Sequence, residues 1–118
     1  MTAHLRSGSL SRPITFQSRS TSQDAAGEQI STWSDIKTVY AMFEGLSAAE
    51  IAKVAALYTD VTHRITVRYD DAFLRDPKLV ASYRIVYNGR YFNIKGSMNL
   101  NEEDRIVELM ASEGLNEG

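Results

Sequence analysis

The chain has 118 residues, of which 43% are hydrophobic and 24% are charged, so it is long enough for one folded domain with a single modest core. Its 13 basic residues against 15 acidic ones give a net charge of −2, which argues against nonspecific nucleic-acid binding, because such binding needs a basic excess. The absence of cysteine excludes disulfides, thiolate catalysis and sulfur-ligated metals, and suits a cytosolic protein. No apolar run is as long as a signal peptide or a membrane span, so we expect a soluble protein without a membrane partner.

The N-terminal part of the sequence predicts an arm, a short strand and a loop. Residues 1–11 are small and polar and are expected to form a flexible arm. Ile14 and Phe16 alternate with polar residues, which indicates a short first strand. Residues 18–29 are rich in Ser, Gln, Asp and Gly, and residues 24–27 have turn chemistry, so we expect a long hairpin loop here.

The segment 30–44 is long and apolar. Its odd-numbered apolar residues share one face of a strand, yet Tyr40 and Met42 on the other face are apolar too. A bent strand, or a strand buried on both faces, explains this pattern. The odd-numbered set includes Trp33, Val39, Ala41 and Phe43.

At Gly45 the pattern changes to that of a helix. Ser47 and Glu50 fit a capping box, in which the serine hydroxyl accepts from a free amide and the glutamate reaches back to the cap. Residues 48–58 are rich in alanine and lack glycine and proline, as a helix prefers. Such a helix of about three turns is marginal alone, so we expect it to dock on the sheet or on another subunit. Its narrow apolar stripe consists of Ile51, Val54, Ala55 and Tyr58.

Residues 61–69 show the strongest strand pattern in the sequence. Mostly apolar residues alternate strictly with polar ones, so one face is expected on the core and the other toward water or a partner. Residues 70–78 follow as a charged loop that contains Pro77. The inward set is Val61, His63, Ile65, Val67 and Tyr69, and the outward set is Thr62, Arg64, Thr66 and Arg68.

Asn88 and Gly89 between two apolar runs predict a two-residue hairpin turn, because both central positions of that turn need positive φ. Counting outward from the turn gives a register that agrees with the hydrophobic pattern. The expected pairs on one face are Tyr87 with Arg90, Ile85 with Phe92, and Tyr83 with Ile94.

The last element has two interpretations. Residues 101–104 (NEED) could cap a helix and place acids in its first turn, which local signals slightly favour. Alternatively, residues 105–110 form a strand with Val107 and Leu109 turned inward. Residues 113–118 are expected to be a flexible tail.

The sequence contains no glycine-rich phosphate loop, nucleophile elbow or paired-histidine zinc motif. His63 is the best single candidate for a general base, but it lies among apolar residues, where a structural histidine is the simpler interpretation. Asp70 and Asp71 are adjacent and point to opposite sides of an extended chain, which is poor geometry for a metal site or a carboxylate pair. We therefore expect no catalytic residues, cofactor or metal.

Tyrosines and arginines offer another possibility, a stacking surface for single-stranded nucleic acid on a small barrel. The charge balance opposes it. The simpler interpretation places the tyrosines in the core or an interface and the arginines against water or a neighbour's carboxylates. The arginines concerned are Arg64, Arg68, Arg84 and Arg90.

The order and spacing of several short pieces carry a family resemblance. The sequence resembles the phage head-tail joining proteins, also called head-tail adaptor, stopper or head completion proteins, which are small neck components of tailed bacteriophages and prophages. The resemblance covers nearly the whole chain. It rests on residues 8–10 (GSL), 12–17 (RPITFQ), 24–27 (DAAG) leading to Trp33, 39–41 (VYA), 46–50 (LSAAE), 62–69 (THRITVRY) and 84–91 (RIVYNGRY).

This resemblance implies a single domain over residues 1–118, mainly β with one helix. The expected fold is a small antiparallel β-barrel or sandwich that carries a helix or long loop between the second and third strands. The resemblance also favours the strand interpretation for residues 105–110.

The implied function is that of a structural virion protein in the neck, not an enzyme. Such proteins form a homo-oligomeric ring, usually of twelve subunits, that joins the DNA-filled head to the tail and in some members closes the DNA channel. The implied partners are a portal or adaptor protein above, a tail completion protein below and double-stranded DNA passing through, with assembly in the host cytoplasm. A tail-terminator-like assembly protein is the alternative in the same particle.

The resemblance also suggests which residues serve assembly. In the family, the segment between the second long strand and the central strand can face the channel, which corresponds here to residues 46–60. We expect polar strand faces to contact neighbouring subunits. The channel-facing or gating candidates are Leu46, Ser47, Glu50, Ile51, Val54 and Tyr58, and the candidates for intersubunit contact are Arg64, Arg68 and Arg84.

Overall fold

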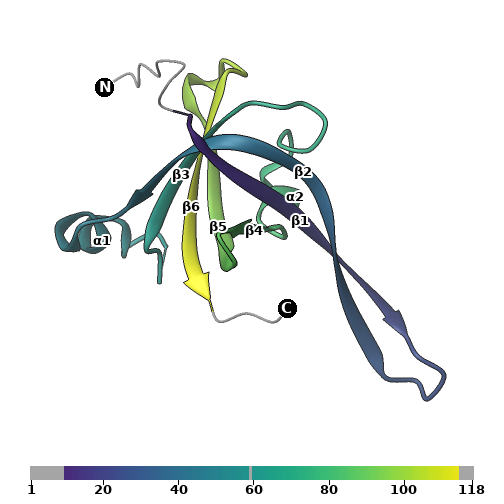
Figure 1. The fold of residues 1–118 in the computed structure, drawn as a ribbon. Helices are drawn as coiled ribbons and strands as arrows, with labels where there is room; N and C mark the ends of the chain where they lie inside the picture. Colours follow the sequence, from purple (N-terminus) through teal and green to yellow (C-terminus); the bar gives the residue numbers. More distant parts are fainter. Residues whose placement is uncertain (1–9, 59, 115–118) are drawn as a thin grey trace.

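The computed structural model describes residues 10–58 and 60–114, which form an antiparallel β-sheet closed into a barrel. The strand order is β1-β2-β3-β6-β5-β4, and β1 closes the barrel by pairing with both β2 and β4 (Figure 1). This confirms the expected fold, including a helix between the second and third strands. The elements are β1 (Arg12–Gln23), β2 (Gln29–Gly45), α1 (Ala48–Val54), β3 (His63–Arg68), α2 (Pro77–Val80), β4 (Arg84–Tyr87), β5 (Arg90–Asn99), a 3₁₀ turn (Leu100–Glu102) and β6 (Ile106–Gly114).

The barrel interior is filled by inward-facing apolar side chains. Ile65 and Val67 of β3 are fully buried, as the alternation in this strand predicted, and so are Phe16 of β1 and Phe92 of β5. Burial of each such side chain contributes roughly 1.5–3 kcal/mol, so this cluster stabilises the fold. Thr66, expected on the face toward water or a partner, is only 2% exposed, so part of that face is covered within the chain itself.

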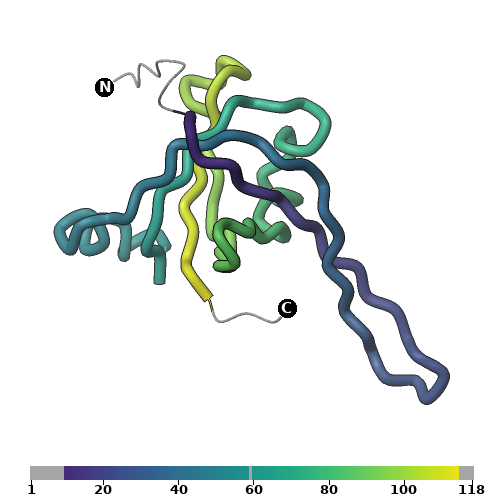
Figure 2. The backbone as a smooth tube through the Cα atoms, viewed as in Figure 1, coloured from purple at the N-terminus to yellow at the C-terminus, as the bar shows by residue number. Residues whose placement is uncertain are grey.

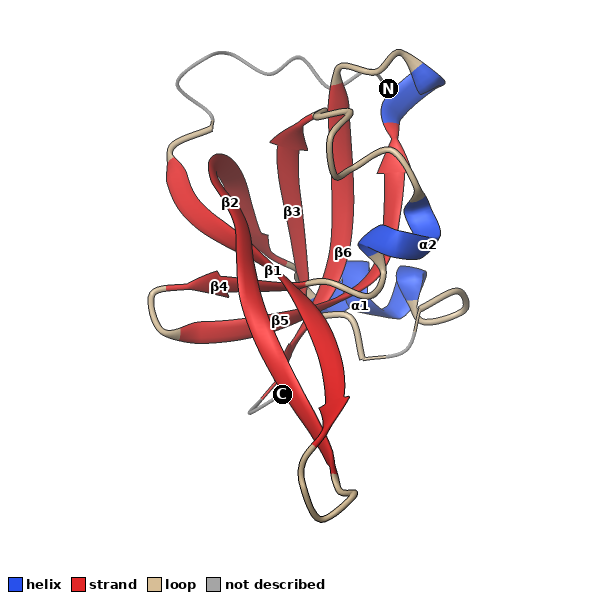
Figure 3. Ribbon diagram, turned by 90° about the vertical axis from the view of Figure 1, so that its right-hand side faces the viewer, coloured by secondary structure: helices blue, strands red, loops and turns tan. Residues whose placement is uncertain are grey.

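One end of the barrel is closed by the segment that the sequence predicted as a loop (Figure 3). The expectation is wrong where α2 begins, after Asp76, whose side chain accepts a hydrogen bond from the amide of Lys78 at 3.0 Å. The ring of Phe73 packs edge-on against Phe16 with centroids 5.0 Å apart. The Tyr83 hydroxyl donates to the Phe73 carbonyl at 3.0 Å. The segment therefore acts as an apolar plug.

The first hairpin extends well outside the barrel (Figures 1 and 2). β1 and β2 stay paired from Arg12 and Ala41 as far as Gln23 and Gln29. The loop predicted over residues 18–29 is therefore wrong, because only residues 24–28 connect the two strands. We call residues 18–34 the ribbon.

Polar contacts hold the ribbon and its turn. The carboxylate of Asp24 accepts hydrogen bonds from the amides of Ala26 and Glu28 at 2.9 and 2.8 Å. Arg19 of β1 donates to the hydroxyl of Ser31 on β2 at 2.9 Å. Such polar cross-strand pairs can stabilise strands that lack the apolar alternation by which strands are recognised.

β2 is a bent strand, which is one of the two structures expected from its apolar residues (Figure 1). Ala41 is fully buried, whereas Tyr40 is 64% exposed and Ile30 is 44% exposed. Within the described chain, therefore, β2 is not buried on both of its faces.

The hairpin turn at Asn88 and Gly89 confirms its prediction, with φ angles of 53° and 73°. The register of β4 and β5 is the predicted one. Ile85 pairs with Phe92 and both are fully buried, which places the expected apolar face inside the barrel.

Residues 106–110 are a strand, as the resemblance implied, and the helix that local signals favoured is wrong. β6 lies between β3 and β5, with Val107 and Leu109 facing the interior. Pairing on both edges overrides the local helix signal, which survives only as the 3₁₀ turn before the strand.

Both chain ends lie partly outside the described residues. Of the expected arm, residues 1–9 are outside, and Leu10 is buried. Of the expected tail, residues 115–118 are outside, and Glu113 and Gly114 belong to β6. None of the helices in the described ranges is long and apolar enough to cross a membrane.

Replacing Gly89 with alanine tests the hairpin turn. We expect Gly89→Ala to lower the free energy of unfolding by about 1 kcal/mol, because a side chain is strained at this positive φ. Urea unfolding followed by circular dichroism measures the change. Asn88→Gly is the control and should change stability by less than about 0.5 kcal/mol, since glycine tolerates the same backbone conformation. Equal losses in the two variants would contradict this account.

Candidate assembly surfaces

Helix α1 begins with the capping box that the sequence predicted. The Ser47 hydroxyl accepts from the Glu50 amide at 3.2 Å, and the Glu50 carboxylate accepts from the Ser47 amide at 3.2 Å. The helix ends at Val54, so the expectation that it continues to residue 58 is wrong in its last turn. The helix is therefore shorter than predicted and has less surface with which to dock.

Arg64 of β3 fastens the start of α1 to the barrel. Its guanidinium lies 3.1 Å from the carboxylate of Glu44 and 3.3 Å from that of Glu50. The hydrogen bonds from Ser47, together with Arg64, lower the pKa of Glu50. These carboxylates are partly exposed, so each ion pair contributes only a modest free energy, which solvent screening reduces further.

An aromatic contact anchors the other end of this segment. No residue of α1 is buried, and Ile51 of the predicted stripe is 38% exposed. The ring of Tyr58 lies directly over Gly96 of β5, so a Cβ atom at that position would be 2.7 Å from the ring. The absence of a side chain at Gly96 makes this close approach possible.

A small apolar cleft lies beside this contact, with a volume of about 190 Å³. We call it the α1–β5 cleft. Leu57 at its rim is 81% exposed and Met98 is 57% exposed. The cleft is lined by Val54, Leu57, Tyr58, Gly96, Ser97, Met98, Glu108 and Met110.

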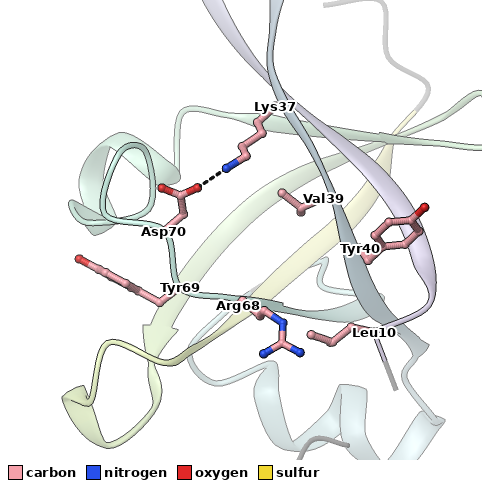
Figure 4. Close-up of a pocket in the computed structure, with 7 residues that line it drawn as sticks. All are labelled: Leu10, Lys37, Val39, Tyr40, Arg68, Tyr69 and Asp70. Atoms are coloured by element: carbon pink, nitrogen blue, oxygen red, sulfur yellow. Dashed lines mark hydrogen bonds and ion pairs between the residues drawn. The ribbon is translucent and has the colours of Figure 1, made fainter. Parts of the chain in front are cut away.

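Arg68 lies at the edge of a larger pocket of about 450 Å³ (Figure 4). Lys37 and Asp70 form an ion pair of 2.7 Å in this pocket, and the hydrogen bond from Lys37 lowers the pKa of Asp70. The Arg68 side chain is exposed beside Leu10. Among the described residues it makes no ion pair, so its guanidinium is available for a contact outside the chain.

Arg84 is buried in the chain itself, at 7% exposure. Its guanidinium carbon lies 4.2 Å from the ring centroids of both Trp33 and Tyr91. The Arg84 Nε donates to the side chain of Gln17 at 2.7 Å, and Gln17 donates to Asp35 at 2.8 Å. Together these contacts attach the base of the ribbon to β4 and β5.

His63 is a half-buried structural residue at one end of the barrel. Its ring lies 5.1 Å from Phe43 and 5.0 Å from Phe92, between centroids, and Nδ1 lies 2.8 Å from the Thr62 hydroxyl. Burial lowers the pKa of His63, and Arg90 lowers it further, whereas Glu113 opposes the shift.

The aspartates that follow β3 are not part of a site with His63. Asp70 pairs with Lys37, and Asp71 accepts a hydrogen bond from the Tyr69 hydroxyl at 2.8 Å. Over residues 10–58 and 60–114, no group of three or more histidine, aspartate or glutamate side chains is placed to hold a metal ion.

Three of the four arginines proposed for a nucleic-acid surface are engaged within the chain. Arg64 pairs with carboxylates, Arg84 stacks on two rings, and Arg90 donates two hydrogen bonds of 2.8 Å to Glu113. Of these four arginines, only Arg68 has an exposed side chain without an ion pair in the described chain.

A comparison with family models identifies the class of protein. The model described as "Phage head completion protein" matches residues 5–114. The chain belongs to the phage head completion protein family. This confirms the resemblance seen in the sequence, and it makes the chain a structural protein of a phage particle.

Solved structures show the same fold as this head completion protein. Protein SF1141 from Shigella flexneri 2a is 27% identical, with a TM-score of 0.70 over 96% of this chain and 100% of that chain. A chain from the virion of a native gene transfer agent particle is 21% identical, with a TM-score of 0.61 over 91% and 97% of the two chains. A comparison with curated proteins found no match.

Sequence reasoning missed several residues of these surfaces. Gly96 was not singled out, since its role appears only when Tyr58 is placed over it. Glu44 has a strand signal only, although an acid three residues before a helix cap is a candidate partner for Arg64. Nothing in the sequence pattern marks Met98 as part of a surface cleft, because it is simply an apolar residue near the end of a strand.

Replacing Gly96 with alanine tests the anchor of α1. The new Cβ would displace the Tyr58 ring, so we expect faster hydrogen exchange over residues 46–58 and unchanged exchange in β3 and β6. The matched control is Gly45→Ala, whose Cβ would lie 3.8 Å from the nearest His63 atom, an ordinary contact. Unchanged exchange of residues 46–58 in Gly96→Ala would show that Tyr58 is not the anchor.

Acidification is expected to destabilise the fold through His63. Because burial lowers the pKa of folded His63, the unfolded chain binds the proton first as the pH falls. The stability contributed by neutral His63 is complete above about pH 6.5 and is lost as the pH falls through the folded pKa. Urea unfolding at about pH 7.5 and about pH 5.5 should show a smaller decrease for His63→Gln than for the wild type. Identical decreases in the free energy of unfolding for the two proteins would show that His63 does not cause the loss of stability.

Proposed function

We propose that this head completion protein forms a ring of about twelve copies at the neck of the phage particle. The ring joins a portal or adaptor protein above to a tail completion protein below, and double-stranded DNA passes through its centre. The subunits are made in the host cytoplasm and assemble there. The role is structural and needs no enzyme activity, cofactor or membrane.

The observation that carries this proposal is the amount of ordered structure that lies outside the core. Helix α1 buries none of its residues, and the ribbon contains no buried residue between residues 18 and 34. A stable protein that keeps such elements outside its core has surfaces suited to partners. Family membership supports the view that these partners are other proteins of the particle.

Residues 46–60 are the proposed channel-facing and gating segment. The segment is held by the Arg64–Glu50 ion pair at its start and the Tyr58–Gly96 contact at its end, while the amide of Leu46 donates to the Thr62 carbonyl at 2.9 Å. These few contacts allow it to move without disturbing the barrel. Its charges are nearly balanced, with Glu50, Lys53 and Asp60, so passing DNA would not be held by its phosphates. The side chains proposed to act there are Leu46, Ser47, Glu50, Ile51, Val54 and Tyr58.

Arg68 is the strongest of the proposed intersubunit contacts, because its side chain is exposed beside a pocket. For Arg64 and Arg84 we propose an indirect role in the contact between subunits. Both already contact groups of their own chain, so they would act mainly by positioning α1 and the ribbon for a neighbour.

Electron microscopy of the protein mixed with its portal tests the ring. We expect rings on the portal, and slower hydrogen exchange of residues 46–60 in the ring than in the free protein. Equal exchange in the two states would eliminate the gating role. Rings found on tails and never on portals would replace the proposal by a tail-terminator role.

The same assay tests Arg68. Arg68→Glu should reduce the yield of rings, because it reverses an exposed charge at the proposed contact. Arg75→Glu is the matched control, since Arg75 is exposed and pairs only loosely with Asp71, at 3.8 Å. Similar yields for the two variants would remove Arg68 from the interface.

A further inference from the structure

The ribbon lacks partners along both of its edges within the described chain. β1 pairs with β4 only as far as Gln17, and β2 pairs with β3 only from Met42. A two-stranded hairpin without a packing surface is at best marginally stable in water. The ribbon also extends about 20 Å beyond the barrel, taking the rise of roughly 3.3 Å for each of six residues of β1. It is therefore built to lie against another molecule.

The α1–β5 cleft is on the opposite side of the barrel from the ribbon. Figure 1 shows α1 and the ribbon projecting in opposite directions, and Figure 3 shows the ribbon in front of the barrel with α1 behind it. The cleft is apolar and rimmed by the exposed side chains of Leu57 and Met98. The ribbon of one molecule therefore cannot reach the α1–β5 cleft of the same molecule.

Charges of opposite sign occur near these two places. The tip of the ribbon carries Asp24 and Glu28, while the exposed residues Lys53 and Lys95 directly precede the cleft residues Val54 and Gly96 in the sequence. None of these four side chains makes an ion pair within the described chain. One acid, Glu108, also lines the cleft.

We infer that the tip of the ribbon docks into the α1–β5 cleft of the next copy of the chain. Unlike surfaces on opposite sides of a subunit give a head-to-tail contact, which closes into a ring when each copy is rotated relative to the last. In a ring of about twelve copies that rotation is about 30°, so the two surfaces must lie nearly opposite each other. The inference rests on the proposed ring and names the contact that builds it.

Cysteine cross-linking tests this contact directly, because the chain contains no cysteine. The variant with both Ala26→Cys at the tip and Leu57→Cys at the cleft should form a ladder of cross-linked chains in rings under mild oxidation. A mixture of the two single variants should give dimers only. Ala26→Cys with Lys78→Cys, an exposed position on α2, is the control and should give no ladder.

Charge reversal provides a second readout. Glu28→Lys or Lys95→Glu alone should raise the protein concentration needed for half-assembly by about fivefold, and the two together should restore it. Asp24 is left unchanged because its carboxylate closes the turn. Rings that form without the cross-link and are insensitive to both reversals would overturn the contact but leave the ring intact. Wild-type protein that forms no rings with its portal would overturn both.

Discussion

Residues 15–17 of β1 pair with β2 on one side and with β4 on the other, and this double pairing closes the sheet. Within this stretch the register with β2 shifts between Phe16 and Gln17, because Ile36 of β2 has no partner residue in β1, and such a bulge bends a strand and increases its twist. Phe16 is thereby fixed in the core, while the rest of β1 leaves the barrel together with β2. One local irregularity separates the part of the hairpin that builds the core from the part that is free to meet a partner.

The contributions to stability also differ between the barrel and the elements outside it. Inside the barrel, many fully buried apolar side chains contribute roughly 1.5–3 kcal/mol each. Outside it, α1 is held by partly exposed ion pairs from Arg64 and by the ring of Tyr58, which together are worth much less. The stability of the barrel therefore depends little on the attachment of the outer elements, and these elements can change position while the barrel keeps its structure.

Much of the barrel was predictable because its signals are local. The alternation in β3, the turn at Asn88 and Gly89, and the capping box of α1 each depend on residues close together in the sequence. The strand β6 was not predictable from local signals, because its pairing with β3 and β5 decides its structure. The resemblance to a known family supplied what the local pattern did not.

The ribbon and the candidate surfaces were harder to predict. The β1 strand of the ribbon consists of polar residues, so it shows no apolar alternation, and cross-strand hydrogen bonds such as that from Arg19 to Ser31 contribute to its pairing instead. The anchor of Tyr58 on Gly96 joins positions 38 residues apart, counted from 58 to 96, and follows only from the folded arrangement of α1 and β5. The sequence suggested that α1 needs a docking surface, but only the structure shows how small that surface is.

The position of Arg84 between Trp33 and Tyr91 has a mechanical consequence. The guanidinium joins β2 to β4 and β5 at the root of the ribbon, where bending would separate a charged group from two rings and from Gln17. The ribbon should therefore be held firmly at its root. A force applied near that root turns the barrel as a whole instead of bending the hairpin away from it.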